Sequence, residues 1–411
     1  MIFPKLNTLN GTIFIGLLVS IITACGDGYS SSSTPLATPT PSSYSYSQPM
    51  ERMDGWSIDS LANHQIDVAK IETLVRAIED NVDIVNFDSI SIVRNGVLLL
   101  DENFKTELDW PDTNYGNHQL SMHSMQSVTK SFTSALVGIA IDQGYLSLND
   151  RFFDYFGEYA NIDNWSDAKN SITVEDVLTM RHGLQWDEWT YPYGDARNTQ
   201  TYTQSFADPV LAVLGLPMAT EPGTTFAYST GITDCLGQML VNATGQSIEA
   251  FAAENLFSPL GITNVLWHKT KTGHAATGYG LFLEPRSMAK FGQLFLDNGM
   301  WEGQQLLSPE WVQQTSIQQL PFPTTNPVYL EILNIGYSLH WWIEDFKMQD
   351  DRIMHTFSAE GNGGQFIFVI PELDMVVVLT GNNYTWEEDS VYGQAFTMMH
   401  DYILPAINLM H

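Results

Sequence analysis

The sequence is poor in positively charged residues. Its 411 residues include 17 Lys and Arg against 47 Asp and Glu, which gives a formal net charge of −30 at pH 7. A surface of this kind repels the phosphates of nucleic acids and the headgroups of anionic membranes. The composition therefore argues against a role in nucleic-acid binding.

Cysteine is also scarce, with only Cys25 and Cys235 in the chain. If Cys25 is modified, as argued below, Cys235 has no partner for an intramolecular disulfide. His118 and His123 lack acidic or histidine companions at spacings that favour metal binding. The sequence therefore predicts no disulfide framework, no metal site and no cofactor.

The N-terminus has only a short hydrophobic run, from Ile13 to Ile22, which cannot span a bilayer as a stable anchor. Lys5 precedes it and Thr23-Ala24-Cys25 follows it, an arrangement typical of a bacterial signal peptide. The residues before Cys25 resemble a lipobox, in which the cysteine is lipidated and becomes the mature N-terminus. We predict a lipoprotein signal peptide over 1–25, with the alternative of an uncleaved or ordinarily cleaved signal. The protein is then exported to the periplasmic side of a membrane or to the cell surface.

Residues 26–52 are rich in Ser, Thr, Pro and Tyr and contain almost no aliphatic residues. Such a segment cannot build a packed core, so we predict a tether. The remaining residues, 53–411, are numerous enough to bury one large core or two lobes that share a cleft. We predict that they form a single catalytic domain.

Hydrophobic periodicity predicts elements at both ends of this domain. Apolar residues recur at helical spacing over 64–80 and again over 391–407. Two apolar runs flank the hairpin signal Asn95-Gly96, and a second hairpin is expected over 365–379. Residues 127–320 show mostly helical patterns joined by long loops. We therefore expect an α+β fold: an antiparallel sheet flanked by N- and C-terminal helices, with a mostly helical lobe inserted and a cleft between the two.

The first chemical motif is Ser127-Val128-Thr129-Lys130, which opens an apolar helical stretch. An offset of three residues places a hydroxyl and an amine on neighbouring faces of one helical turn. The helix N-terminus favours a developing oxyanion and disfavours an ammonium, which suits a lysine that acts as a neutral base. The bland alternative is an N-capping serine followed by a solvated lysine.

Two further motifs follow in the chain. Tyr228 begins a Tyr-Ser-Thr segment after the turn-forming Glu221-Pro222-Gly223, and its phenol is expected to have a lowered pKa beside the Lys130 ammonium. It could instead be a packing residue. A glycine-rich stretch from Gly361 to Gly364 leads into an apolar strand, where backbone amides could face an oxyanion, or it could be a simple turn.

The three motifs, in this order, resemble those of the penicillin-recognising serine hydrolases, the β-lactamase and transpeptidase-like family. This family includes class C β-lactamases, D-alanyl-D-alanine carboxypeptidases, family VIII esterases and 6-aminohexanoate-dimer hydrolases. The stretch Leu178–Glu188, the stretch Glu284–Gly292 and the C-terminal hairpin are also similar to the family. The hairpin fits the 6-aminohexanoate-dimer hydrolase and esterase branch best.

The resemblance implies roles for individual residues. Ser127 matches the nucleophile, Lys130 the general base, and Tyr228 the residue that protonates the leaving group. The oxyanion hole would combine the Ser127 amide with one amide of Gly361, Asn362, Gly363 and Gly364, of which Asn362 is the best choice. Thr230 and the aromatic residues Tyr191 and Trp341 are expected to contact the substrate, although packing is an equal alternative for the aromatics.

Two departures from the family pattern bear on specificity. Thr230 replaces the asparagine of the second lactamase motif, and no Lys-Thr-Gly precedes Phe366. A literal Lys271-Thr272-Gly273 lies too soon after Tyr228 and precedes no hairpin, so we do not assign it. We expect neutral esters or amides, or substrates with a free amine, to be preferred because the acidic surface repels anions.

The sequence thus predicts a serine hydrolase that cleaves ester or amide bonds of small molecules through an acyl-enzyme on Ser127. Within enzymes the alternative is a β-lactamase or D-alanyl-D-alanine carboxypeptidase. The alternative from another class is a sensor that is acylated once and holds the adduct. No obligate protein partner is evident.

Overall fold

The computed structural model describes residues 41–159, 161–317, 320–322, 332–348, 350–384 and 389–408. Cys25, the rest of the predicted signal peptide and residues 26–40 of the predicted tether lie outside these ranges. Within the ranges, no helix is both long and apolar enough to cross a membrane.

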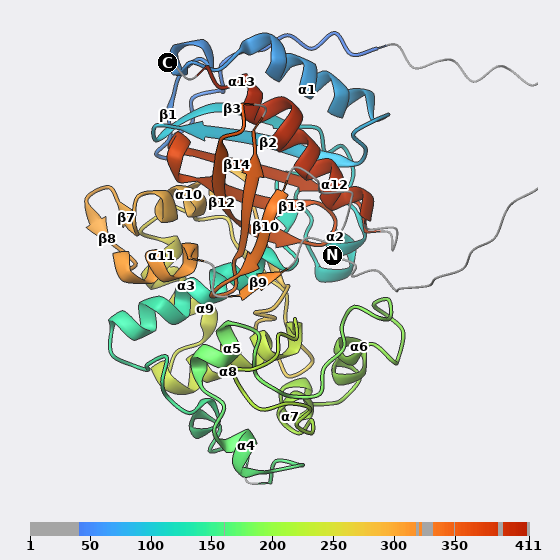
Figure 1. Cartoon of the computed structure of the whole chain (residues 1–411), viewed down its shortest axis with the longest axis vertical. Helices are drawn as coiled ribbons and strands as arrows, with labels where there is room; N and C mark the ends of the chain where they lie inside the picture. The colour runs from blue at the N-terminus through green and yellow to red at the C-terminus, as the bar shows by residue number, and fades with distance from the viewer. Residues whose placement is uncertain are drawn as a thin grey trace, which may run out of the picture.

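A nine-stranded sheet forms the centre of the molecule, with the strand order β1-β3-β2-β14-β13-β12-β11-β10-β9. Every neighbouring pair is antiparallel except β1 and β3. In Figure 1, strands from the two ends of the chain, blue and red, lie side by side in this sheet. The strands are β1 (Ser57–Ile58), β2 (Phe87–Arg94), β3 (Val97–Asn103), β9 (Leu320–Phe322), β10 (Ile332–Tyr337), β11 (Trp342–Lys347), β12 (Ile353–Gly361), β13 (Gln365–Ile370) and β14 (Met375–Gly381).

Both predicted hairpins are present. Asn95 and Gly96 have φ angles of 54° and 69°, as a tight two-residue turn between β2 and β3 requires. The second hairpin joins β13 to β14 through η5 (Pro371–Leu373). Strands β2, β13 and β14 are buried along their whole length, because helices cover both faces of the sheet.

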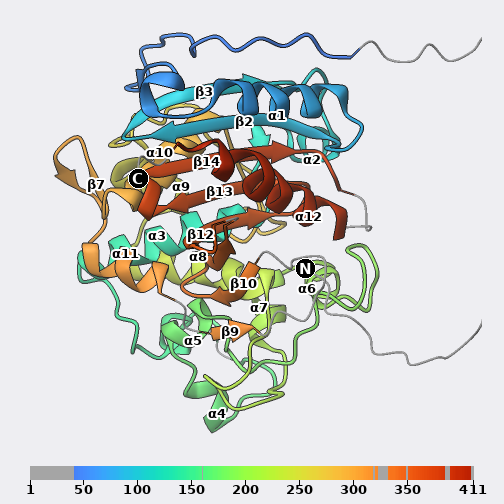
Figure 2. The same ribbon diagram turned by 45° about the horizontal axis from the view of Figure 1, so that its top comes forward.

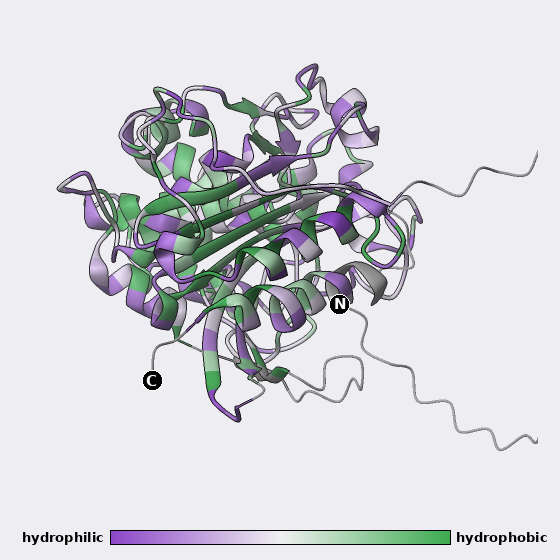
Figure 3. Cartoon of the chain, turned by 90° about the horizontal axis from the view of Figure 1, so that it is seen from above, coloured by the Kyte–Doolittle hydropathy of each residue, from purple (hydrophilic) through white to green (hydrophobic). Residues whose placement is uncertain are grey.

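Alternating side chains of the central strands pack against helices on the two faces of the sheet. Phe366 and Phe368 contact Phe396 of α12 (Asp389–Thr397) on one face. On the other face, Ile367 and Val376 pack so closely on α10 (Pro285–Leu296) that only Gly292 fits between them. Figure 2 shows α1 (Val68–Asp80) and α12 on the same side of the sheet, and Figure 3 shows the apolar strands enclosed between helices.

The inserted lobe, below the sheet in Figure 1, is mostly helical, as predicted. The remaining elements of the chain are η1 (Ala62–His64), α2 (Trp110–Tyr115), β4 (His123–Ser124), α3 (Val128–Asp142), η2 (Phe152–Tyr155), α4 (Asp167–Asn170), α5 (Val174–Leu178), α6 (Thr199–Gln204), α7 (Pro209–Leu214), α8 (Thr230–Thr244), α9 (Ile248–Ala252), the π-helical η3 (Ala253–Phe257), β5 (Leu266–Trp267), β6 (Leu281–Leu283), β7 (Met300–Trp301), β8 (Gln304–Gln305), α11 (Pro309–Ser316), the π-helical η6 (Met398–Ile403) and α13 (Leu404–Ala406).

The end of the predicted tether contacts the domain. The Tyr44 hydroxyl donates to Glu102 at 2.6 Å, and the Tyr46 hydroxyl donates to the Leu99 carbonyl at 2.9 Å. Both rings pack against the core. These contacts attach the segment along β3, whereas the division of the chain at residues 25 and 52 stays a prediction.

Candidate active site

Ser127 stands at the start of α3, at the edge of a pocket. The preceding residue, Gln126, has a φ of 45°, an uncommon backbone conformation for a residue with a side chain. The Ser127 side chain makes no capping hydrogen bond to its own helix. Its hydroxyl lies 2.9 Å from the Lys130 amine instead, so the two groups of the predicted pair meet.

The Lys130 amine is buried among three oxygen atoms. Its Nζ lies 2.9 Å from Ser127 Oγ, 2.9 Å from Thr230 Oγ1 and 2.8 Å from the Gly278 carbonyl oxygen. Burial lowers the pKa of Lys130 to about 8, although the nearby carboxylates Glu188 and Asp234 act in the opposite direction. A neutral amine, as a general base requires, is therefore accessible near neutral pH.

Tyr228 lies beside Ser127 and Lys130. Its ring centroid is 4.8 Å from Lys130 Nζ. The ring stacks against Trp189, at 5.2 Å, and against Trp342, at 5.9 Å. The expected lowering of its pKa is wrong: burial, together with Glu188 and Glu360, raises the pKa of the phenol. Tyr228 therefore holds its proton at neutral pH, as a proton donor must.

Glu188, which the sequence analysis did not select, connects to Lys130 through Thr230. Its buried carboxylate accepts from the Thr230 amide at 2.7 Å and from the Thr230 hydroxyl at 2.5 Å. It also accepts from Trp186 Nε1 at 3.0 Å and from the Tyr193 hydroxyl at 2.8 Å. The Thr230 hydroxyl thus donates to Glu188 and accepts from Lys130, which fixes the amine.

Asp234, which was also not predicted, is connected to Lys130 through Gly278. It lies one turn after Thr230 on α8, and its Oδ1 accepts from the Gly278 amide at 2.8 Å. The carbonyl of the same glycine accepts from Lys130. The spacing from Thr230 to Asp234 could have revealed this residue, because positions four apart share a helix face.

The glycine-rich turn lies beside Ser127. A Cβ atom on Gly361 would be 2.5 Å from the Met125 carbonyl oxygen, so β12 approaches the segment before Ser127 at backbone contact. Gly363 and Gly364 have φ angles of 88° and 99° and form the turn into β13. Asn362 lines the pocket. The turn is thus in place to present amides, and the choice of the Asn362 amide for the oxyanion hole stays a prediction.

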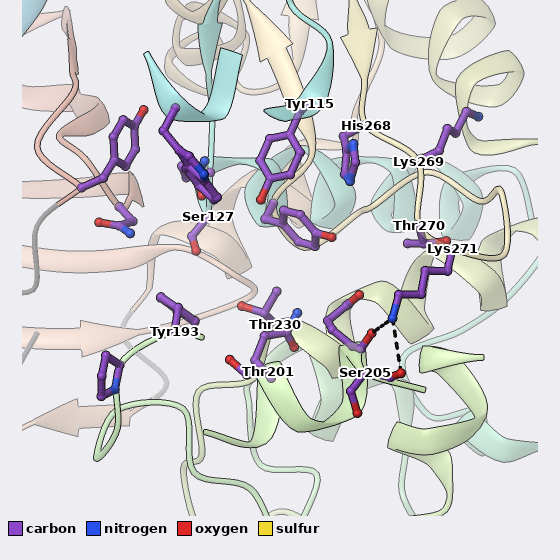
Figure 4. Close-up of a pocket in the computed structure, with 18 residues that line it drawn as sticks. Tyr115, Ser127, Tyr193, Thr201, Ser205, Thr230, His268, Lys269, Thr270 and Lys271 are labelled. Atoms are coloured by element: carbon purple, nitrogen blue, oxygen red, sulfur yellow. Dashed lines mark hydrogen bonds between the residues drawn. The ribbon is translucent and has the colours of Figure 1, made fainter. Parts of the chain in front are cut away.

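Ser127 opens into a pocket of about 880 Å³ (Figure 4). Aromatic side chains form much of its wall, and hydroxyl, amide and amine groups occupy the remainder. The lining residues are Trp110, Tyr115, Gln126, Ser127, Pro192, Tyr193, Gln200, Thr201, Gln204, Ser205, Thr230, His268, Lys269, Thr270, Lys271, Tyr279, Asn362 and Tyr384.

Two aromatic predictions need correction. Trp341 is fully buried between Phe291 and Phe295 in the core, so the prediction that it contacts substrate is wrong. Tyr191 is not among the residues that line the pocket; its ring lies 4.0 Å from the Arg197 guanidinium, and its neighbours Pro192 and Tyr193 face the cavity instead. Thr230 does line the pocket, as expected.

The segment Lys271-Thr272-Gly273 forms a surface turn closed by the bridge between Lys269 and Ala275, so it is not the strand motif of the lactamases. Lys271 nevertheless lines the pocket. Within the described residues, no group of three or more His, Cys, Asp or Glu side chains is arranged to hold a metal ion.

Comparisons with known proteins agree with this geometry. A family model described as β-lactamase matches residues 88–396. Protein flp of Staphylococcus aureus (strain COL) is 26% identical over 195 residues, 47% of this chain and 37% of that protein. The 6-aminohexanoate-dimer hydrolase of Paenarthrobacter ureafaciens is 24% identical over 279 residues, 62% of this chain and 65% of that protein.

Among solved structures, a family VIII carboxylesterase superposes with a TM-score of 0.54 at 15% identity, covering 80% of this chain and 96% of that one. The chain therefore matches well under half of the length of protein flp but has the complete fold of the carboxylesterase. The predicted α+β fold and the predicted resemblance to the β-lactamase and transpeptidase-like family are both confirmed. The chain belongs to the β-lactamase family.

Proposed function

We propose that the protein is a serine hydrolase that cleaves ester or amide bonds of small molecules through an acyl-enzyme on Ser127. One observation carries the proposal: the three neighbours of the Lys130 amine. A neutral amine has two N–H donors and one lone pair. With its donors on Thr230 and Gly278, its lone pair faces the Ser127 hydroxyl, which can then lose its proton to the amine.

The remaining groups complete the reaction. The Ser127 oxygen attacks the substrate carbonyl carbon, and backbone amides at Ser127 and the 361–364 turn receive the oxyanion. Tyr228 donates its proton to the departing oxygen or nitrogen, and the proton held by Lys130 replaces it. Water then attacks the acyl-enzyme while Lys130 accepts its proton. When the tetrahedral intermediate collapses, Lys130 returns this proton to the Ser127 oxygen and the free acid leaves.

The names of the relatives support ester and amide bonds as targets, since one is a 6-aminohexanoate-dimer hydrolase and another a family VIII carboxylesterase. Ala359 and Glu360 precede Gly361 at the end of β12, so this strand offers no lysine to a β-lactam carboxylate. A β-lactam carboxylate held against β12 would be desolvated there without a cationic partner, which is costly. We therefore favour esters and amides over β-lactams.

The test combines labelling with a substrate panel. A fluorophosphonate probe should label the wild type and fail to label Ser127→Ala, and p-nitrophenyl butyrate should be turned over many times. We expect kcat/KM for a chromogenic cephalosporin to be about 10²-fold lower, equivalent to about 2.7 kcal/mol. A cephalosporin that reacts fastest would establish the β-lactamase alternative. A burst of one equivalent without turnover would establish the sensor.

We also propose that the enzyme is an exported lipoprotein held by Cys25 on the periplasmic side of a membrane or at the cell surface. The proposal rests on the apolar run and the lipobox-like residues before Cys25.

A further inference from the structure

The charge of the pocket is opposite to that of the chain. The chain contains 47 Asp and Glu residues, yet none of the described residues that line the pocket is acidic. Lys269, Lys271 and His268 line it instead. Burial lowers the pKa of His268, so the two lysines supply the positive charge near neutral pH.

The two lysines differ in their partners. Lys269 forms an ion pair with Glu249, which neutralises its charge. The Lys271 ammonium instead donates to two backbone carbonyls at the end of α6, Gln204 at 2.7 Å and Ser205 at 3.3 Å. No described carboxylate lies within ion-pair distance of it. Two of its three donors are thus used to fix its position, and its charge stays unpaired.

Lys271 lies across the pocket from the nucleophile. In Figure 4 its ammonium and the Ser127 hydroxyl are on opposite sides of the cavity, and Tyr115, Thr201 and Thr230 are between them. The rings of Trp110, Tyr115, Tyr279 and Tyr384 provide apolar surface along the wall. The cavity therefore offers a reactive group at one end, aromatic and hydroxyl side chains along its wall and an unpaired cation at the other end.

We propose that Lys271 binds an anionic group at the far end of the acyl part of the substrate. The inference rests on the proposed function and names its substrate class: small esters or amides of acids that carry a second carboxylate beyond an apolar linker. The acyl part is the relevant one because it stays on Ser127 until water releases it, so the pocket must hold it in both half-reactions. A charge-assisted hydrogen bond from the free donor of Lys271 would hold the carboxylate.

This substrate class differs from the one that net charge alone predicts. The field of the acidic surface acts over a Debye length of about 10 Å at 0.1 M salt and slows the approach of anions. Lys271 is the charged residue of the described lining that has no described counter-ion, and a direct contact outweighs the screened field of surface carboxylates. Slow association with tight binding is the expected combination.

The experiment compares two matched probes: mono-p-nitrophenyl glutarate, and the same ester with its free carboxylate capped as a methyl ester. Release of p-nitrophenol gives kcat/KM for both. The wild type should prefer the carboxylate probe by about tenfold or more, and the ratio should fall with added salt. In Lys271→Gln, kcat/KM for the carboxylate probe should fall while kcat/KM for the capped probe stays the same, so the preference is lost. Lys271→Arg should keep most of the preference.

Lys269→Gln is the matched control, since that lysine lines the same wall but is already paired, and its ratio should stay within about twofold of the wild type. Absence of a preference in the wild type, or a preference that survives in Lys271→Gln, would overturn the inference. Failure of the proposed function would look different, because neither probe would then show turnover that depends on Ser127.

Discussion

The environment of Lys130 sets the pH dependence of the enzyme. Burial gives the amine a pKa of about 8, and only the neutral form can accept the Ser127 proton. We predict that kcat/KM for p-nitrophenyl butyrate rises as the pH is raised through about 8 and then levels off. A profile that stays flat from pH 6 to pH 10 would contradict the role of Lys130 as base.

Asp234 provides a second test of the environment of Lys130, because it is connected to the amine through Gly278. Asp234→Asn keeps an oxygen for the Gly278 amide but removes a negative charge that raises the pKa of Lys130. The pH at which kcat/KM reaches half of its plateau should therefore move to a lower value. A purely structural role would lower the plateau and leave that pH unchanged.

The proposed role of Tyr228 as proton donor depends on its hydroxyl group and not on its ring. Tyr228→Phe keeps the stacking against Trp189 and Trp342 but removes the hydroxyl near Ser127. We predict a loss of about 10²-fold in kcat with an unchanged melting temperature. Near-normal kcat in this variant would remove Tyr228 from the mechanism.

The turn between strands β12 and β13 requires glycine. Gly363 has a φ of 88°, and a Cβ there would lie 2.3 Å from the Tyr384 ring. Gly363→Ala should therefore displace the turn from Ser127 and reduce kcat by at least about tenfold.

The matched control for this variant is Gly96→Ala in the β2–β3 turn, where φ is 69° and no atom lies within 4 Å of the added Cβ. It should cost about 1 kcal/mol or more of stability from backbone strain. Its kcat should stay at the wild-type level. Equal losses of kcat in both variants would show that general destabilisation, rather than the position of the turn, is responsible.

The sequence predicted the elements whose apolar pattern is regular. Helix α1 and both hairpins fall where the periodicity places them. Strands β11 and β12 were not predicted because polar residues interrupt them. Glu344 and Glu360 are buried there within hydrogen-bonding distance of Ser358, and burial raises the pKa of both carboxyls. Buried carboxyls of this kind give a strand the pattern of a surface loop.

The sequence predicted those active-site residues that belong to a recognisable motif. Ser127, Lys130 and Tyr228 belong to spaced motifs, and the structure brings them together. Glu188 was missed because one carboxylate among 47 acidic residues gives no signal until the fold places it near Lys130. Asp234 did have a signal, its spacing of four residues from Thr230, but this signal was not used. Trp341 was misassigned because residue type alone does not distinguish a tryptophan packed in the core from one that lines a pocket.

For the full-length protein, we predict that a lipid on Cys25 holds the enzyme on a membrane. In a bacterial host the full-length protein should partition into detergent and carry a lipid on Cys25. Cys25→Ser should appear in the soluble fraction with the same kcat, because the catalytic residues lie far along the chain from the anchor. Soluble wild-type protein would contradict the prediction.

The central sheet also has a consequence for how the protein reaches its native state. β14 pairs with β2, so Ile92 lies opposite Val377, and the two partners are 377 − 92 = 285 residues apart in a chain of 411. Contacts between residues so distant in sequence are entropically slow to form, which lowers the folding rate. The middle of the sheet can close only after the segment Met375–Gly381 has been synthesised. Folding is therefore expected to follow synthesis, and a chain that ends before β14 would leave β2 and β13 without their shared neighbour.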